Sequence, residues 1–194
     1  MKKLHRNTAQ GIVDALSNIF YKNGRATRVL EKLNLANPKW GARDRNSVHQ
    51  ATYEIIRWKN YYCFLSGTDK NLTDVPQLWN LLGTWLVLNS LKLPDWDEFA
   101  TLDVNLIRAN QKEKVTSEIY KSIPNWLYER GKEELSEKWD DELEALNLEA
   151  KLILRVNRIV ISPKKLQQEL LDKYQIETQF IKGYDDALLM NVRK

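Results

Sequence analysis

The side chains most often used in catalysis or metal binding are few in this sequence and lie far apart. Histidine occurs only at His5 and His49, and Cys63 is the single cysteine. No spacing among the three matches a metal-ligand pattern, so structural or surface roles are expected for both histidines. Cys63 lies in a segment of helical character and has no local pattern of an activated nucleophile, so we expect a small buried side chain. The sequence therefore predicts no catalytic residue and no metal site in this chain.

Acidic residues and glycines give no sign of an active site either. Carboxylates cluster between Glu129 and Glu144, but on an amphipathic helix such a cluster is usually a solvated face. The seven glycines are scattered singly, so the sequence has neither a phosphate-binding loop nor a dinucleotide fingerprint. No cofactor-binding residue is expected, and this chain alone is not expected to be an enzyme.

Basic residues are more informative, because they gather in the first part of the chain. Residues 1–62 contain twelve Lys and Arg against four Asp and Glu, a net charge of +8. The remaining residues contain 18 against 22, a net charge of −4. A basic front on a nearly balanced body favours a polyanionic partner. Composition alone is equally compatible with a solvated basic surface that binds nothing.

Several basic residues fall at positions suited to phosphate. Arg43 and Arg45 open a single long helix expected over residues 43–64, where N-terminal amides favour anions and arginine forks match phosphate oxygens. Arg25 and Arg28 share one side of a short helix, away from its apolar stripe. The candidates for phosphate contact are Arg6, Arg25, Arg28, Arg43, Arg45, Arg57 and Lys59, and those for stacking on unpaired bases are Trp40, Tyr61 and Tyr62. Core packing is the alternative for each aromatic residue, and it is the favoured one for Tyr62.

The hydrophobic pattern predicts a mostly α-helical chain that ends in a small α+β unit. Apolar residues recur at helical spacing through residues 1–121, which indicates one all-helical domain. Residues 122–150 are expected to form linking helices, and Trp126 is large enough to anchor the junction between the two parts. In residues 151–194 the apolar period changes to two. The elements expected there are strands over 151–161, 176–181 and 187–192, with a helix opened by Ser162-Pro163.

The first of these strands carries two polar residues of interest. Arg155 and Asn157 alternate with Leu154 and Val156, so they are expected on the face that points away from the local core. A layer of two or three strands with open edges is a poor place for a protein to stop. We therefore expect the α+β unit to be incomplete and the natural protein to be longer.

Targeting and membrane signals are missing from the sequence. No apolar run approaches the roughly 20 residues of a membrane span. The basic start has no apolar region of a secretory signal behind it. A single cysteine cannot form an internal disulfide, which fits a reducing compartment. These features predict a cytoplasmic protein with no membrane partner.

Several segments of the chain resemble one known family. Residues 122–127, Ser-Ile-Pro-Asn-Trp-Leu, resemble its S-x-P-x-W-L segment, and residues 154–157, Leu-Arg-Val-Asn, resemble its L-R-V-N strand, in the same order. Weaker similarities lie at residues 41–45 and 53–57. On these segments the chain resembles the N-terminal region of the RsmB/Sun (Fmu) 16S ribosomal RNA cytosine-5 methyltransferases, over essentially its whole length.

The resemblance implies a NusB-like helical RNA-binding domain over residues 1–121 and a small α/β domain ahead of a methyltransferase domain. In that family the S-adenosylmethionine (SAM) site and two catalytic cysteines lie in the later, Rossmann-like domain. No residue here matches them, so neither a catalytic nor a cofactor role carries over. The implied function is RNA binding and substrate positioning. The implied partners are ribosomal RNA and the methyltransferase domain, with Trp126, Arg155 and Asn157 as interdomain candidates.

Two other functions remain open from the sequence. A NusB-like transcription antitermination factor would bind RNA and a protein partner, but it would end near residue 125, so the segments at 124–126 and 155–157 count against it. A helical protein-interaction adaptor would bind RNA weakly and with little salt dependence. A glycine-rich SAM loop followed by Pro-Cys and Thr-Cys-Ser segments beyond Lys194 would decide for the methyltransferase.

Overall fold

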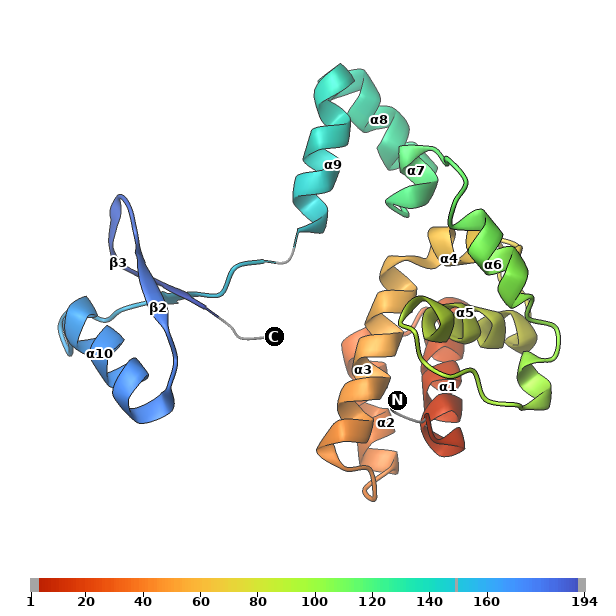
Figure 1. Cartoon of the computed structure of the whole chain (residues 1–194), viewed down its shortest axis with the longest axis horizontal. Helices are drawn as coiled ribbons and strands as arrows, with labels where there is room; N and C mark the ends of the chain where they lie inside the picture. The colour runs from red at the N-terminus through yellow and green to blue at the C-terminus, as the bar shows by residue number, and fades with distance from the viewer. Residues whose placement is uncertain (1–3, 149, 192–194) are drawn as a thin grey trace. The chain divides into compact units, whose positions relative to one another are not determined.

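Helices make up most of the structure, and a small antiparallel sheet lies in its last part (Figure 1). The structure, a computed structural model, describes residues 4–148 and 150–191. It divides into two compact units, Met1–Glu144 and Ala145–Lys194, which we call the helical unit and the α/β unit. The division falls within the segment expected to form linking helices. The predicted fold class, mostly α with a small α+β unit, is confirmed.

The helical elements are short to medium in length and follow one another closely. In chain order they are α1 (Arg6–Lys22), α2 (Ala26–Ala36), α3 (Ala42–Arg57), α4 (Lys59–Ser66), α5 (Val75–Leu88), η1 (Asp97–Phe99), α6 (Val104–Asn110), α7 (Ser117–Tyr120), α8 (Asn125–Leu135), η2 (Ser136–Lys138) and α9 (Trp139–Asn147).

Helix α1 packs against α2, α3 and α5 through one apolar side. Ile12 and Leu16 on this side are fully buried. Gly11 allows a close approach, because a Cβ at that position would lie 2.4 Å from the ring of Trp40. The Trp40 indole N–H donates to the side-chain oxygen of Asn7, and the ring is buried in the core, so Trp40 is not available to stack on a base. The opposite side of α1 faces solvent.

The prediction of one continuous helix over residues 43–64 is wrong, because the helix is interrupted at Trp58. Helix α3 ends at Arg57 and α4 begins at Lys59, with Trp58 at φ −105° and ψ 22° between them. In a continuous helix the Asn60 amide would bond to the carbonyl four residues earlier. Here the Asn60 amide donates instead to Ser122 Oγ at 2.8 Å. A contact from far along the chain therefore replaces a bond within the helix.

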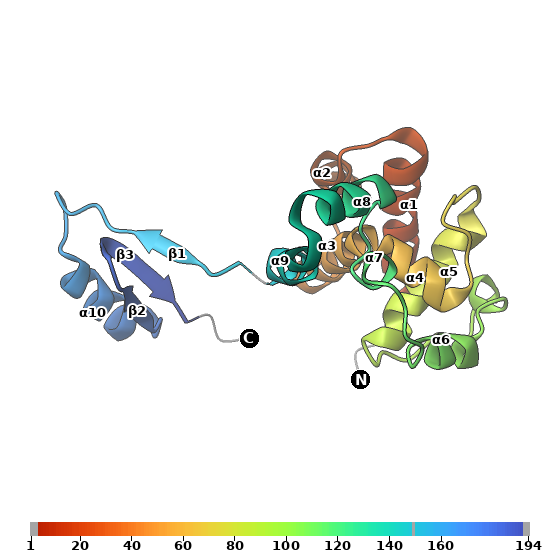
Figure 2. The same ribbon diagram turned by 90° about the horizontal axis from the view of Figure 1, so that it is seen from above.

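Helices α8 and α9 form a hairpin with a small core of its own (Figure 2). Ile123, Trp139 and Leu143 are buried in it. Gly131 in α8 faces the indole of Trp139, and a Cβ there would lie 2.2 Å from Trp139 Cε2. The absence of a side chain at Gly131 is therefore what lets the two helices approach around this ring.

The α/β unit contains the strands β1 (Ile153–Arg155), β2 (Thr178–Ile181) and β3 (Tyr184–Met190) and the helix α10 (Pro163–Tyr174). The strand order is β1-β3-β2, and β3 is antiparallel to both neighbours. Strands β1 and β2 are therefore parallel to each other with β3 between them. Helix α10 packs against β2 and β3.

The first strand is shorter than the alternation over residues 151–161 predicts. Pairing with β3 ends at Arg155, and the Val160 amide already bonds to the Asn157 carbonyl at 3.0 Å in a turn. This turn places Ser162 ahead of α10, where its Oγ accepts from the Lys165 amide at 3.3 Å. The predicted cap at Ser162-Pro163 is thus confirmed, and its position accounts for the short strand. None of the helices within residues 4–148 and 150–191 has the length and hydropathy that crossing a membrane requires.

We predict that Gly131→Ala destabilises the hairpin by roughly 1–3 kcal/mol, because the new methyl group overlaps a ring that cannot move out of a packed site. Amide hydrogen exchange in α8 and α9 should become about 5- to 150-fold faster. The matched control is Gly41→Ala, where the nearest atom to a Cβ is Asp44 Oδ2 at 3.9 Å. Equal exchange rates in the two variants would show that Trp139 does not pack on Gly131.

Candidate nucleic-acid interface

A surface groove between α1 and α2 gathers four basic side chains. Its volume is about 700 Å³. Lys22 comes from the last turn of α1, Arg25 from the N-cap position of α2, and Arg28 and Lys32 from the following two turns. All four side chains are exposed. We call this feature the basic groove.

The turn between the two helices shapes the basic groove. Asn23 ends α1 in the left-handed conformation, with φ 52°, and its amide bonds back to the Asn18 carbonyl. Gly24 then passes close to α2, since a Cβ there would lie 2.7 Å from Val29 Cγ2. A larger residue at Gly24 would push α2 away from α1. The local sequence therefore keeps the helices close enough for cations from both to line one groove.

The start of α2 adds to the anion affinity of the basic groove. Arg25 occupies the N-cap position but has no side-chain oxygen, and it makes no capping bond. The first amides of α2 are therefore open to another acceptor, and the positive end of the helix dipole points the same way. One carboxylate, Asp14, also lines the groove, with Oδ1 accepting from Gln10 Nε2 at 2.9 Å. The groove keeps an excess of positive charge.

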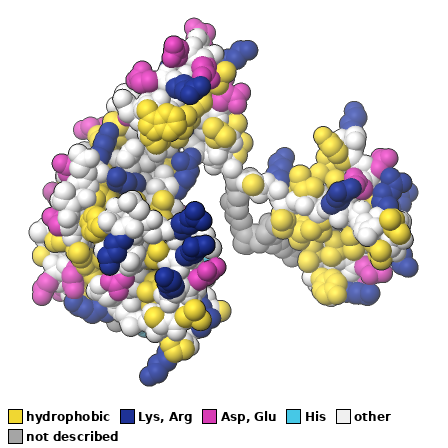
Figure 3. Space-filling view, turned by 180° about the vertical axis from the view of Figure 1, so that it is seen from behind, with side chains coloured by type: hydrophobic (Ala, Val, Ile, Leu, Met, Phe, Trp, Pro, Cys, Tyr) yellow, Lys and Arg dark blue, Asp and Glu magenta, His cyan; other side chains and the backbone are white. Residues whose placement is uncertain are grey.

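Charge is unevenly spread over the surface of the helical unit. Figure 3 shows Lys and Arg side chains across the visible face of this unit, and Asp and Glu side chains both at the end formed by the α8–α9 hairpin and along the edge and lower part of the unit. Acidic residues in the first turn of α9 are Asp140, Asp141 and Glu142. A polyanion is therefore expected to meet the helical unit away from the hairpin.

Arg6 has structural partners within the helical unit. Its guanidinium pairs with Glu98 and lies 5.3 Å from the centroid of the Trp96 ring. These contacts link the start of α1 to the segment around η1. Much of the charge of Arg6 is thus compensated, and its assignment to RNA contact stays a prediction with less support than Arg25 and Arg28 have.

The remaining basic candidates lie in two other places. Arg43 lines a hollow of about 230 Å³ with Asn46 and Gln50, and Arg45 is exposed on α3. Arg57 and Lys59 flank the helix break at Trp58, where the Arg57 guanidinium lies 5.1 Å from the centroid of the Trp58 ring. The seven sequence candidates therefore do not form one cluster.

Two basic residues of the groove, Lys22 and Lys32, were not among the sequence candidates. Arg25, Arg28 and Lys32 are spaced by three and four residues, which is the spacing of one helix face. That signal could have added Lys32. Lys22 comes from a different helix, and only the close turn at Gly24 brings it to the others.

Trp126, expected at the junction, is 67% exposed on α8. The tryptophan that is buried in the hairpin is Trp139, which is 6% exposed. The expected anchoring role of Trp126 has no support in the packing of the helical unit. Its role toward another domain stays a prediction.

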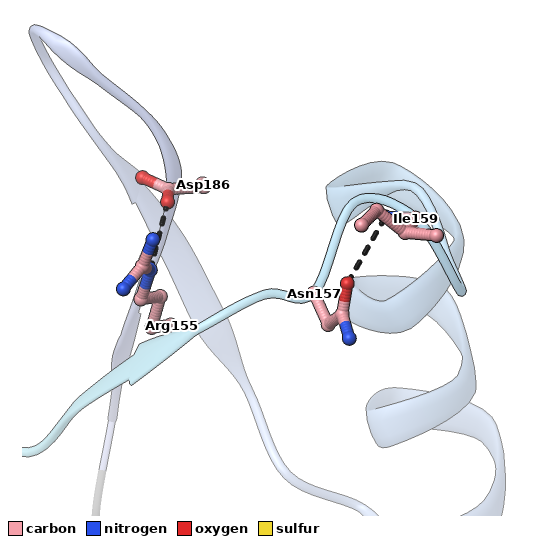
Figure 4. A network of polar contacts seen from close by, with 4 residues as sticks. All are labelled: Arg155, Asn157, Ile159 and Asp186. Carbon is pink, nitrogen blue, oxygen red and sulfur yellow. Dashed lines mark hydrogen bonds and ion pairs between the residues drawn. The ribbon is translucent and has the colours of Figure 1, made fainter.

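Arg155 and Asn157 both point outward, as the alternation with Leu154 and Val156 predicts. Figure 4 shows that their contacts are local. Arg155 Nε donates to Asp186 Oδ2 on β3 at 3.2 Å, and Asn157 Oδ1 accepts from the Ile159 amide at 3.1 Å. Together they border a hollow of about 530 Å³. Their interdomain role stays a prediction.

The histidines and the cysteine show no shared site in the described structure. His49 Nε2 lies 2.9 Å from Asn34 Nδ2 and so joins α3 to α2. Cys63 is fully buried in the main core, and burial raises the pKa of its thiol to about 11. Within residues 4–148 and 150–191, no three His, Cys, Asp or Glu side chains come together as metal ligands.

Three glycines of the helical unit lie where helices pack closely. Gly11, Gly83 and Gly131 each lie within a helix and face a side chain of a neighbouring element, namely Trp40, Leu102 and Trp139. They permit helix packing, whereas a cofactor loop needs backbone amides that face a phosphate. These three glycines therefore serve helix packing, and the expectation that the chain holds no cofactor stays a prediction.

Part of the chain matches a known domain family. Residues 123–193 match the model described as Methyltr_RsmF/B-like, ferredoxin-like domain. The match covers less than half of the chain and spans the α8–α9 hairpin and the α/β unit. The β-α-β-β order of that unit, with β3 between the parallel β1 and β2, equals the first four elements of a ferredoxin-like fold. This segment is therefore related to RsmF/B-like methyltransferases.

One solved structure is similar to the whole chain. The structure titled "Crystal Structure of PH0851" matches with a TM-score of 0.55 and 12% sequence identity, over 100% of this chain and 50% of that chain. At this identity the likeness shows a shared fold. The present chain spans about half the length of the structure it matches. No curated protein matches it in sequence.

We predict that Cys63 reacts only slowly with an aromatic disulfide reagent at pH 8 in the folded protein. The thiolate is the reactive form, and a thiol whose pKa is about 11 is almost entirely protonated three units lower. Reaction should become fast when urea unfolds the chain and returns the thiol to its ordinary pKa. A fast reaction without urea would show that the core around Cys63 opens readily.

Proposed function

We propose that this chain is the RNA-binding and substrate-positioning N-terminal region of a SAM-dependent ribosomal RNA cytosine-5 methyltransferase. The basic groove between α1 and α2 is the single observation that carries the RNA-binding part. The relation of residues 123–193 to the RsmF/B-like methyltransferases supports the choice of enzyme class. Methyl transfer itself belongs to a domain outside this chain.

Phosphate contact in the basic groove follows from the chemistry of its lining. Arginine offers a planar fork of donors to phosphate oxygens, and lysine offers a mobile point charge. Arg25 and Arg28 supply the forks, while Lys22 and Lys32 flank them. Contacts of this kind fix the position of a nucleic acid without reading its sequence. This is the behaviour required of a region that presents RNA to a separate catalytic domain.

Two alternative functions would use parts of the same surface. A NusB-like transcription antitermination factor would also place RNA on a helical domain, but a match that continues over residues 123–193 has no place in it. A helical protein-interaction adaptor would not need four exposed cations in one groove. The comparison of RNA binding at several salt concentrations separates these functions.

We predict that replacing Lys22, Arg25, Arg28 and Lys32 with glutamine weakens binding to a structured ribosomal RNA fragment. Each phosphate contact that is lost should flatten the slope of log K against log salt by about 0.7 for a single strand or about 0.9 for a duplex. Glutamine keeps most of the side-chain length and polarity, so the fold should persist in a thermal melt. Titrations at four or five salt concentrations measure both quantities.

The control variant removes the same charge from elsewhere in the helical unit. Lys70, Lys92, Lys112 and Lys114 are all exposed and lie outside the groove, and their replacement by glutamine gives the same net charge. If the control loses as much affinity and slope as the groove variant, binding depends on net charge alone. If neither variant changes binding, the helical unit acts as a protein-docking module.

We also predict that the chain binds no SAM. Calorimetric titration with SAM should give only heats of dilution, because Gly11, Gly83 and Gly131 face packed side chains and the single thiol is buried in the core. A dissociation constant in the micromolar range would contradict the assignment of all methyl-transfer chemistry to another domain.

A further inference from the structure

A small pocket with aromatic walls lies beside the helix break at Trp58. Its volume is about 200 Å³, and Trp58, Tyr61, Tyr62, Leu88 and Tyr120 line it. Four of these five side chains are aromatic. We call it the aromatic pocket. The aromatic pocket and the basic groove share no lining residue.

The break in the helix and the Ser122 contact together build the aromatic pocket. Because α3 ends at Arg57, Trp58 leaves the helix axis, while α4 turns Tyr61 toward the same place. The bond from the Asn60 amide to Ser122 Oγ, 2.8 Å long, holds the end of α7 beside α4. This brings Tyr120 against Tyr61, with ring centroids 5.3 Å apart and planes at 74°.

The rings of the aromatic pocket differ in exposure: Tyr62 is buried, Trp58 and Tyr61 are half-buried, and Tyr120 is the exposed ring. An edge-to-face pair such as Tyr61 and Tyr120 leaves at least one ring face uncovered by its partner. Tyr120 is 50% exposed. The Tyr61 hydroxyl, whose pKa is raised by burial and then by the neighbouring Tyr120, is neutral at physiological pH as an ordinary tyrosine is.

Two cations lie against rings of the aromatic pocket, while the Glu54 carboxylate acts on Tyr62. The Arg57 guanidinium lies 5.1 Å from the Trp58 ring centroid, and the Lys121 ammonium lies 5.4 Å from that of Tyr120. Lys121 also lies 3.8 Å from Glu144, which compensates part of its charge. Arg57 is exposed. A ligand with a flat ring and an attached anion fits both the walls and the rim, because an apolar protein side chain would leave this charge unmatched.

We propose that the aromatic pocket binds an unpaired base of a single-stranded RNA segment, with Arg57 and Lys59 at the phosphates beside it. Stacking of bases on aromatic side chains tolerates any sequence, because every base has a π-face. A base within a duplex is already stacked and paired, so it does not enter such a pocket. The aromatic pocket therefore distinguishes unpaired from paired RNA.

Lys59, which follows the helix break, contacts the end of α1. Its ammonium lies 5.6 Å from the ring centroid of Phe20, in the last part of α1, the helix that also supplies Lys22 to the groove. Lys59 therefore lies beside the same helix that supplies one cation to the groove. The inference rests on the proposed RNA-binding function, because the groove supplies most of the phosphate contacts.

The test uses the full chain and a 12-nucleotide single-stranded RNA that carries one 2-aminopurine, a base whose fluorescence falls when it stacks. Wild type should quench the probe, and Tyr120→Phe should quench it equally because the aromatic face remains. Tyr120→Ala should lose the quench and bind the single strand roughly 5- to 150-fold more weakly. Tyr120→Leu keeps most of the apolar packing but not the ring, so it should behave like the alanine variant even if alanine perturbs α7.

Two controls separate the pocket from general electrostatics. A fully paired duplex of the same length should bind the Tyr120 variants as tightly as it binds wild type. Replacement of the exposed Tyr174 in the α/β unit by alanine should leave the binding of both RNAs unchanged. Unchanged quenching and affinity in Tyr120→Ala, with a steep salt slope retained, would overturn the pocket and leave the groove intact. Wild-type binding that does not depend on salt would instead overturn the phosphate-binding role of the groove. Failure of wild type to bind either RNA would overturn both the groove and the pocket as RNA sites.

Discussion

Burial of one side of α1 between α3 and α5 is the constraint on which the helical unit depends. Ile12 and Leu16 occupy the fully buried positions, and Gly11 lets Trp40 pack directly on the helix. With that side committed to the core, the last turn of α1 can only present Lys22 to solvent, next to the start of α2. The same hydrophobic packing that fixes the fold therefore also fixes where positive charge collects.

Local sequence signals predicted the features that depend on a few neighbouring residues. The cap at Ser162 and the outward faces of Arg155 and Asn157 follow from residue type and spacing, and the structure has them. The basic front was equally visible in the sequence. The sequence did not show that these basic residues separate into the basic groove, a hollow at Arg43 and a pair at the helix break. That separation depends on tertiary packing.

Contacts from distant parts of the chain explain where prediction failed. Nothing near residues 43–64 interrupts helical spacing, and the break at Trp58 is accompanied by a bond from Asn60 to Ser122, sixty-two residues later. Likewise, Trp126 and Trp139 both suit a buried helix face by their spacing alone. Trp139 is the buried one because Gly131 lies opposite it. A single sequence does not say which bulky residue will meet which small one across a helix hairpin.

The small core of the α/β unit has a thermodynamic consequence. Within residues 150–191, only Val156 and Leu188 are buried hydrophobic side chains, whereas the core of the helical unit joins residues from five of its helices. A layer of about fifty residues with so little apolar burial has a stability near the margin on its own. The two units then lose their structure under different conditions, and a single free energy of unfolding does not describe the molecule. Any ligand or domain that covers the sheet would change the melting of the second unit far more than that of the first.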